Sequence, residues 1–295
     1  MYIYTKRIFA AMFTSTMLVM MPTYAALPDT STFVEQTERG TIDWTKGANS
    51  SVTAIGIGLP GGKGLAMARV AAVMDAQRNL LGIIKGVQID ADTLMQDLMI
   101  QSDTVKRNIS GLLQGAQIVE EYENPDDSYF VRMRVSLYGA TGSVASAVLP
   151  EVARNAAPEP LPTVTQTALP KQETEAVRSA NYTGVVVEAS GLGLAPTFSP
   201  IIYDVNGRAV YGIRNIDSQT AIAKGMVGYV DSLGNATSGS RAGTNPLIVT
   251  AVEVRGSKNS SNPVNVVVSV EDADRILIAN EKGAFLPQGA VVFVR

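Results

Sequence analysis

The pattern that most resembles a chemical site is a run of glycines between a predicted strand and a predicted helix. Gly56, Gly58 and Gly61 match the spacing G-x-G-x-x-G. In dinucleotide-binding proteins such a loop brings backbone amides and a helix N-terminus to a pyrophosphate. The acidic residue that should follow about 20 positions later is missing, because residues 80–84 read LLGII. We therefore interpret the glycines as a turn and predict no cofactor.

Two close pairs of carboxylates are the next candidates for chemistry. Asp90 and Asp92 precede a predicted helix, and Asp126 and Asp127 lie in a predicted hairpin turn. A carboxylate hydrolase needs two acids that converge from separate elements. Both pairs instead suit local roles as caps and turn formers. The second pair, together with Glu123, could also hold calcium weakly, although a solvated turn is favoured.

Two arginines could form a binding surface. Arg132 and Arg134 alternate with apolar residues along a predicted strand, and they share a face with Ser136 and Tyr138. Such a face could meet acidic groups of a partner or a glycan. The alternative is an ordinary solvated face of an antiparallel sheet.

Histidine and cysteine are both absent from the 295 residues. Histidine is the commonest general base and metal ligand, so its absence argues against catalysis and metal binding. Without cysteine no disulfide or thiolate site can form. The net charge of -3 comes without a basic stripe, which argues against nucleic-acid binding. We predict that the protein is not an enzyme.

The N-terminus has the pattern of a secretory signal peptide. Lys6 and Arg7 precede an almost wholly apolar run at residues 8–21, and small residues follow up to Ala25. The run is shorter than the ~20 residues that a transmembrane helix needs. We predict cleavage near Ala25 and a periplasmic location, with a retained anchor as the alternative.

A long helix is expected at about residues 65–84. Its predicted core face consists of Ala66, Val70, Val73, Gln77, Leu80, Leu81 and Ile84. Ala68, Ala72 and Ala76 lie on the opposite face, where small side chains would let a second surface approach closely. The alternative is that alanine is simply a good helix former.

The remaining patterns predict an α+β protein of two small mixed domains joined by a Pro-rich linker. Residues 26–149 combine helices with a hairpin of strands at 116–123 and 128–138. Residues 150–181 hold five of the fourteen prolines and are expected to be extended. Residues 182–295 form the second domain, which contains an Asn-Gly turn signal at residues 206–207.

Three segments carry a resemblance to a known family. They read ARVAAVMDAQRNLLGIIKGV at 68–87, SDTVKRNISGLLQGAQIVEE at 102–121 and YFVRMRVSLYG at 129–139. This order resembles the LPP-twenty lipoprotein family of envelope proteins, with its FlgP- and FlgT-like flagellar members. The residues that carry the likeness are Ala68, Arg69, Asp75, Ala76, Arg78, Leu80, Gly86, Ile109, Gly111, Gly115 and Ala116.

The resemblance implies a structural role in the periplasm or at the outer membrane, such as a ring or disk of a flagellar basal body, and no active site. Many relatives carry a lipid on a cysteine, which this chain lacks. Peripheral membrane association would therefore depend on partners. We expect homo-oligomers and contacts with other envelope or flagellar proteins. The alternative is a binding module for a glycan or small ligand that uses the loop at residues 191–200.

Overall fold

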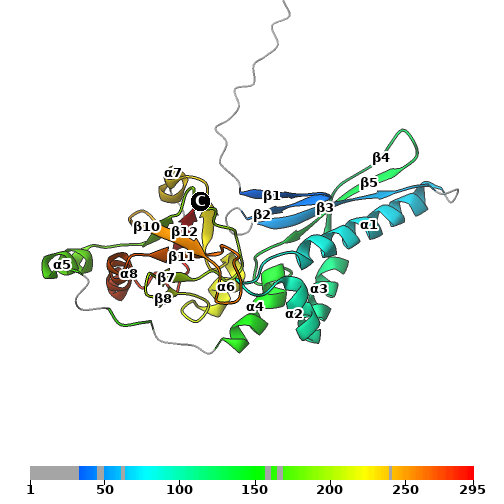
Figure 1. Ribbon diagram of the computed structural model, residues 1–295. Helices are drawn as coiled ribbons and strands as arrows, with labels where there is room; N and C mark the ends of the chain where they lie inside the picture. The colour runs from blue at the N-terminus through cyan, green and yellow to red at the C-terminus, as the bar shows by residue number, and fades with distance from the viewer. Residues whose placement is uncertain (1–32, 45–49, 61–63, 157–160, 165–168, 239–240) are drawn as a thin grey trace, which may run out of the picture. The chain divides into compact units, whose positions relative to one another are not determined.

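The computed structural model describes residues 33–44, 50–60, 64–156, 161–164, 169–238 and 241–295. The predicted signal peptide, residues 1–25, lies outside this part of the chain. The described residues form two sheets with accompanying helices, so the predicted α+β class is confirmed (Figure 1). No helix among them combines the length and the apolar character needed to cross a bilayer.

The N-terminal sheet is antiparallel, with the strand order β1-β2-β3-β5-β4. Its strands are β1 (Val34–Thr37), β2 (Gly40–Asp43), β3 (Ser51–Gly58), β4 (Gln117–Glu123) and β5 (Tyr129–Ser136). Its helices are α1 (Leu65–Lys85), α2 (Met95–Gln101), α3 (Asp103–Gln114) and α4 (Val144–Asn155). Helix α1 runs along one face of β3 and β5 (Figure 1).

Helix α1 buries its alanines, which is the reverse of the predicted arrangement in its N-terminal half. Ala68, Ala72 and Ala76 are fully buried, whereas Val70 is 48% exposed. The reason lies in the facing strand. A Cβ atom at Gly56 would lie only 2.2 Å from the carbonyl oxygen of Ala72, so helix and strand pack backbone to backbone. Such a close approach leaves room for alanine but not for larger side chains. The three alanines therefore cannot form an interaction surface for another chain.

This packing makes a testable prediction for β3. A Cβ atom at Gly58 would lie 1.9 Å from the carbonyl oxygen of Ala68. We expect Gly58→Ala to lower the free energy of unfolding by about 3 kcal/mol, because the overpacked atom meets backbone that cannot rotate away. Gly82→Ala is the control, since a Cβ there meets nothing within 4 Å in α1. It should raise stability by about 0.5–1 kcal/mol. Urea unfolding would measure both changes, and equal stability of the two variants would contradict the packing argument.

The C-terminal sheet is mixed, with the strand order β8-β7-β11-β10-β6-β12-β9. Its strands are β6 (Gly184–Glu188), β7 (Ile202–Asp204), β8 (Ala209–Tyr211), β9 (Gly228–Val230), β10 (Pro246–Arg255), β11 (Asn265–Val268) and β12 (Val291–Val294). Its helices are α5 (Lys171–Ser179), α6 (Ser218–Lys224), α7 (Leu233–Thr237) and α8 (Val270–Gly283). The central strands β6 and β12 are parallel and almost wholly apolar, as expected for strands covered on both faces.

The segment predicted to be an extended linker is partly helical. Helix α4 continues past residue 149 and includes Pro150, and α5 occupies a large part of the later segment. Leu169 and Val177 are buried in the main hydrophobic core, and α5 packs against α8. Ion pairs of Glu173 with Arg275 and of Arg178 with Glu281 add to these apolar contacts, although the polar composition of the segment gives no sign of a core.

Candidate functional site

The most unusual surface lies at one end of the N-terminal sheet. Nine of the sixteen exposed large hydrophobic residues in the described chain come from the end of β3, the N-terminal half of α1 and the edge strand β4. We call this set the distal surface: Ile57, Leu59, Leu65, Met67, Val70, Met74, Ile118, Val119 and Tyr122. Figure 1 shows the ends of β3, α1 and the β4–β5 hairpin at the same end of the sheet. Ile57 and Tyr122 lie on the sheet face opposite α1, and Met67, Val70 and Met74 lie on the outer side of α1, so the set surrounds this end of the sheet. Exposed apolar side chains that gather in one region mark interaction surfaces.

Strand β4 adds an open backbone edge to the distal surface. It is the terminal strand of its sheet in the described part of the chain, and all seven of its residues are exposed. A long, exposed edge strand can pair with another chain. The register of β4 against β5 shifts between Ile118 and Glu120, so a bulge interrupts the edge near Val119.

Arg132 and Arg134 are exposed on the face of the sheet opposite α1, as their alternation predicts. Both contact residues of β4. Arg132 Nη1 lies 2.8 Å from Glu120 Oε2, and Arg134 Nη2 donates to Gln117 Oε1 at 3.3 Å. An acidic partner would therefore compete with Glu120 for Arg132.

Tyr138 does not share this exposed face, although the alternation along the strand predicts that it would. Its side chain is only 5% exposed and lies beyond the end of β5. The aromatic residues of the open face are instead Tyr122 and Phe130, whose rings stack with centroids 4.6 Å apart. The guanidinium carbon of Arg132 lies 5.7 Å from the centre of the Phe130 ring. The open face thus carries the stacked rings of Tyr122 and Phe130 beside the guanidinium of Arg132.

Two charged residues of α1 tie the helix to the sheet. Arg69 Nε donates to Glu121 Oε2 at 2.7 Å, and this hydrogen bond lowers the pKa of Glu121. Asp75 Oδ2 accepts from the backbone amide of Ile57 at 3.2 Å. Asn79, one turn further along, donates to the carbonyl of Ile55 at 2.7 Å. These contacts hold the N-terminal half of α1 in place while its outer side chains stay exposed.

The two carboxylate pairs have the local roles that their positions indicate. Asp90 Oδ1 accepts from the amides of Asp92 and Thr93, each at 2.9 Å. Asp126 Oδ1 accepts from the hydroxyl of Ser128 at 2.6 Å, which lowers the pKa of Asp126. Nowhere in the described residues do three or more acidic, histidine or cysteine side chains form a group that could hold a metal ion. The calcium alternative at Asp126, Asp127 and Glu123 gains no support from this geometry.

The loop at residues 191–200 packs inside the protein from residue 194 onward. Phe198 is fully buried, and its ring centre lies 5.6 Å from that of Trp44 and 5.3 Å from that of Tyr138. The amide of Ser199 donates to the carbonyl of Ile89 at 2.7 Å. This part of the loop, which the sequence offers as a ligand-binding element, contributes Leu194 and Phe198 to the hydrophobic core that the two sheets share.

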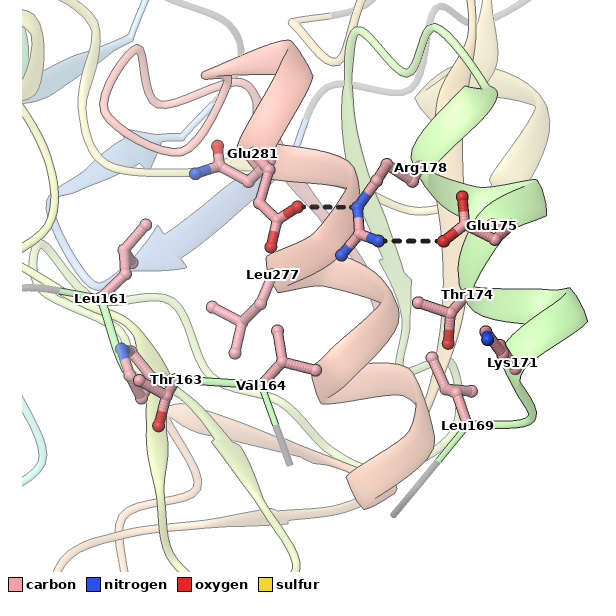
Figure 2. A pocket seen from close by; sticks show the side chains of 12 residues that line it. Leu161, Thr163, Val164, Leu169, Lys171, Thr174, Glu175, Arg178, Leu277 and Glu281 are labelled. Carbon is pink, nitrogen blue, oxygen red and sulfur yellow. Dashed lines mark hydrogen bonds and ion pairs between the residues drawn. The ribbon is translucent and has the colours of Figure 1, made fainter. Parts of the chain in front are cut away.

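Figure 2 shows a cavity of about 850 Å³. It is lined by residues 161–164, by Leu169 and α5, and by the C-terminal half of α8. Arg178 of α5 points at two carboxylates there, with Nε 3.1 Å from Glu281 Oε2 and Nη1 3.3 Å from Glu175 Oε1. Leu277 and Leu161 provide apolar walls. Because the charges pair with one another, we assign this cavity to the packing of α5 on α8 and not to a ligand.

The sequence analysis does not predict the distal surface, because it places Val70 on the core face of α1 and assigns Met67 and Met74 to neither face. The signal that could have revealed it is that α1 is apolar on two sides. Met67, Val70 and Met74 form an outer stripe, while the alanines and Leu80 form the inner one. A helix that has apolar residues on both sides must be covered on both sides or expose one of them.

Comparison with known proteins bears on the C-terminal sheet. Residues 184–295 match the family model described as Treponema pallidum Tp0624, second domain. A comparison with curated proteins gave no significant match. The matched segment begins at the first residue of β6 and includes every strand up to β12. The C-terminal sheet is therefore similar to the second domain of Treponema pallidum Tp0624.

Proposed function

We propose that this protein is a non-catalytic structural protein of the cell envelope that self-associates through the distal surface. The concentration of exposed apolar side chains at one end of the N-terminal sheet carries the proposal. Leaving these side chains in water costs free energy, and a second copy of the chain would cover them. The open edge of β4 lies within the same surface and offers main-chain hydrogen bonds to a partner strand.

The location belongs to the same proposal. A signal peptide cleaved near Ala25 would deliver the chain to the periplasm. The resemblance of residues 50–140 to the LPP-twenty family supports a place in an envelope assembly, such as a flagellar basal-body ring or disk. Contact with the outer membrane would then depend on partner proteins, because the chain has no cysteine for a lipid.

A charge placed within the distal surface should disrupt self-association. We expect the exported chain, purified from the periplasm, to form oligomers in light scattering after size exclusion, and Val70→Glu to shift it toward the monomer. Val70 lies in the outer stripe of α1 and is 48% exposed, so a glutamate there would be buried unpaired in the interface but solvated in the monomer.

Ile248→Glu is the matched control. Ile248 is also 48% exposed, but it lies on β10, away from the distal surface. This variant should associate like the unmodified chain. A monomeric unmodified chain at high concentration, or equal association of the two variants, would refute the proposal. Loss of motility or of envelope integrity in a deletion strain would then show which assembly needs the protein.

A further inference from the structure

A second cavity, of about 770 Å³, lies where the two sheets meet. We call it the junction cavity. Its walls come from the loop at residues 89–93, the C-terminal ends of α2 and α4, the β7–β8 hairpin and the segment 212–215. Its volume is within the ~300–1,000 Å³ that small-molecule sites usually have.

Hydrogen bonds between the two halves hold these walls together. Asp92 Oδ1 accepts from the hydroxyl of Ser257, and Asn262 Nδ2 donates to the carbonyl of Ala91 at 3.2 Å. The amide of Ser199 donates to Ile89. The cavity is thus formed in advance and does not depend on a ligand to bring its walls together, which lowers the cost of binding.

The charges around the junction cavity are balanced. Asp90, Asp92, Arg208 and Arg214 line it. The guanidinium of Arg208 is already bound by Asp204 and, behind it, by Asp274. Because no excess of positive charge faces the cavity, a phosphate or a carboxylate would gain little from binding there. The balance suits an uncharged ligand.

Three polar residues that line the cavity carry groups that can bind the hydroxyls of a ligand. Ser199 and Tyr203, whose side chains carry hydroxyl groups, are among the residues that line it. Asp90 uses only Oδ1 for its turn, and its Oδ2 makes no hydrogen bond among the described residues. A carboxylate oxygen accepts a short, strong hydrogen bond from a hydroxyl. Ile89 and Ile213 add apolar surface beside these groups.

We propose that the junction cavity binds a neutral sugar of one or two residues. A sugar ring presents hydroxyls around its rim and C–H groups on its faces, which matches polar groups placed beside apolar walls. This site is separate from the distal surface, so the proposal does not depend on self-association.

Calorimetric titration of the exported chain with N,N′-diacetylchitobiose, cellobiose and maltose tests the proposal. We expect at least one of these disaccharides to bind, and inorganic phosphate and spermidine not to bind. Asp90→Asn should weaken binding about tenfold, because the amide keeps the Oδ1 acceptor of the turn but replaces the second acceptor with a donor. Asp126→Asn is the control, because Asp126 has the same kind of turn role outside the cavity.

A second variant fills the cavity. A Cβ atom at Gly212 would lie 3.5 Å from Ile201 Cγ1, which is ordinary contact, and both residues line the cavity. We therefore expect the longer side chain of Gly212→Leu to extend into the cavity. We expect this variant to stay folded, by circular dichroism, and to lose sugar binding. Absence of binding by all three disaccharides, preferential binding of phosphate or spermidine, or sugar binding unchanged in Asp90→Asn and Gly212→Leu would overturn the proposal.

Discussion

Replacing Arg208 with glutamine is expected to lower the free energy of unfolding by about 3–5 kcal/mol. Arg208 Nε lies 2.9 Å from Asp204 Oδ2, and its Nη2 lies 2.8 Å from Asp274 Oδ1. Both carboxylates are buried, with side chains that are 2% and 0% exposed. The third nitrogen of the guanidinium donates to the carbonyl of Thr163 at 2.8 Å. Without Arg208, two negative charges would remain close together and out of water.

Arg178→Gln is the matched control for this experiment. Arg178 also contacts two carboxylates, Glu175 and Glu281, but all three side chains are 45–65% exposed. Exposed ion pairs contribute at most about 1 kcal/mol, so this variant should unfold nearly like the unmodified chain. Urea unfolding followed by circular dichroism would measure both variants. Equal destabilisation by the two substitutions would contradict the argument from burial.

A triple variant distinguishes the cost of unpaired buried charge from the cost of lost packing. Adding Asp204→Asn and Asp274→Asn to Arg208→Gln removes both buried charges and leaves side chains of similar volume. We expect this variant to recover part of the lost stability, because the main cost in the single variant is unpaired charge. Asparagine at position 204 can still accept the turn amides of Asn206 and Arg208 through its remaining oxygen.

Elements whose pattern is local could be predicted well from the sequence. The hairpin expected at 116–123 and 128–138 is present as β4 and β5. Strands β7 and β8 flank the turn that Asn206 and Gly207 indicate. Ser269 caps α8 by accepting from the amide of Asp272. Each of these features depends on residues within a few positions of one another, so alternation and turn chemistry suffice to find it.

Features that depend on another element could not be predicted in the same way. The buried face of α1 depends on Gly56 and Gly58, which belong to strand β3. Their lack of a side chain matters only because α1 packs against them, and the sequence does not show that contact. The pairing of Arg132 with Glu120 depends on the register and bulge of β4. The distal surface follows from the first of these features. The exposure of Arg132 and Arg134, by contrast, follows from alternation alone.

The burial of the loop at residues 191–200 could not be predicted from the sequence for the same reason. The glycines and prolines at residues 191–200 indicate a loop, and loops usually lie on the surface. Leu194 and Phe198 of that loop are fully buried, whereas Leu192 stays 37% exposed. Their partners, such as Trp44, lie far away in the sequence, so no local pattern could show that the loop would be covered.

Phe198→Ala is therefore expected to be among the most destabilising single substitutions, with a loss of about 3–5 kcal/mol. The ring is fully buried between Trp44 and Tyr138, so its removal leaves a cavity at the centre of the junction. Phe130→Ala is the control, because Phe130 stacks on Tyr122 at the partly exposed face of the N-terminal sheet. It should cost about 1 kcal/mol, since little apolar area returns to water.

The number of transitions in urea unfolding shows whether the N-terminal and C-terminal halves unfold cooperatively. A single hydrophobic core that includes residues of both sheets predicts one transition in urea, shifted to lower concentration in Phe198→Ala with an unchanged slope. The amide of Ser199, which donates to Ile89 across the junction, should exchange faster in the same variant. Two separate transitions in the unmodified chain would show that the halves fold independently. The junction cavity would then lack the fixed walls that its proposed sugar requires, because its lining comes from both halves.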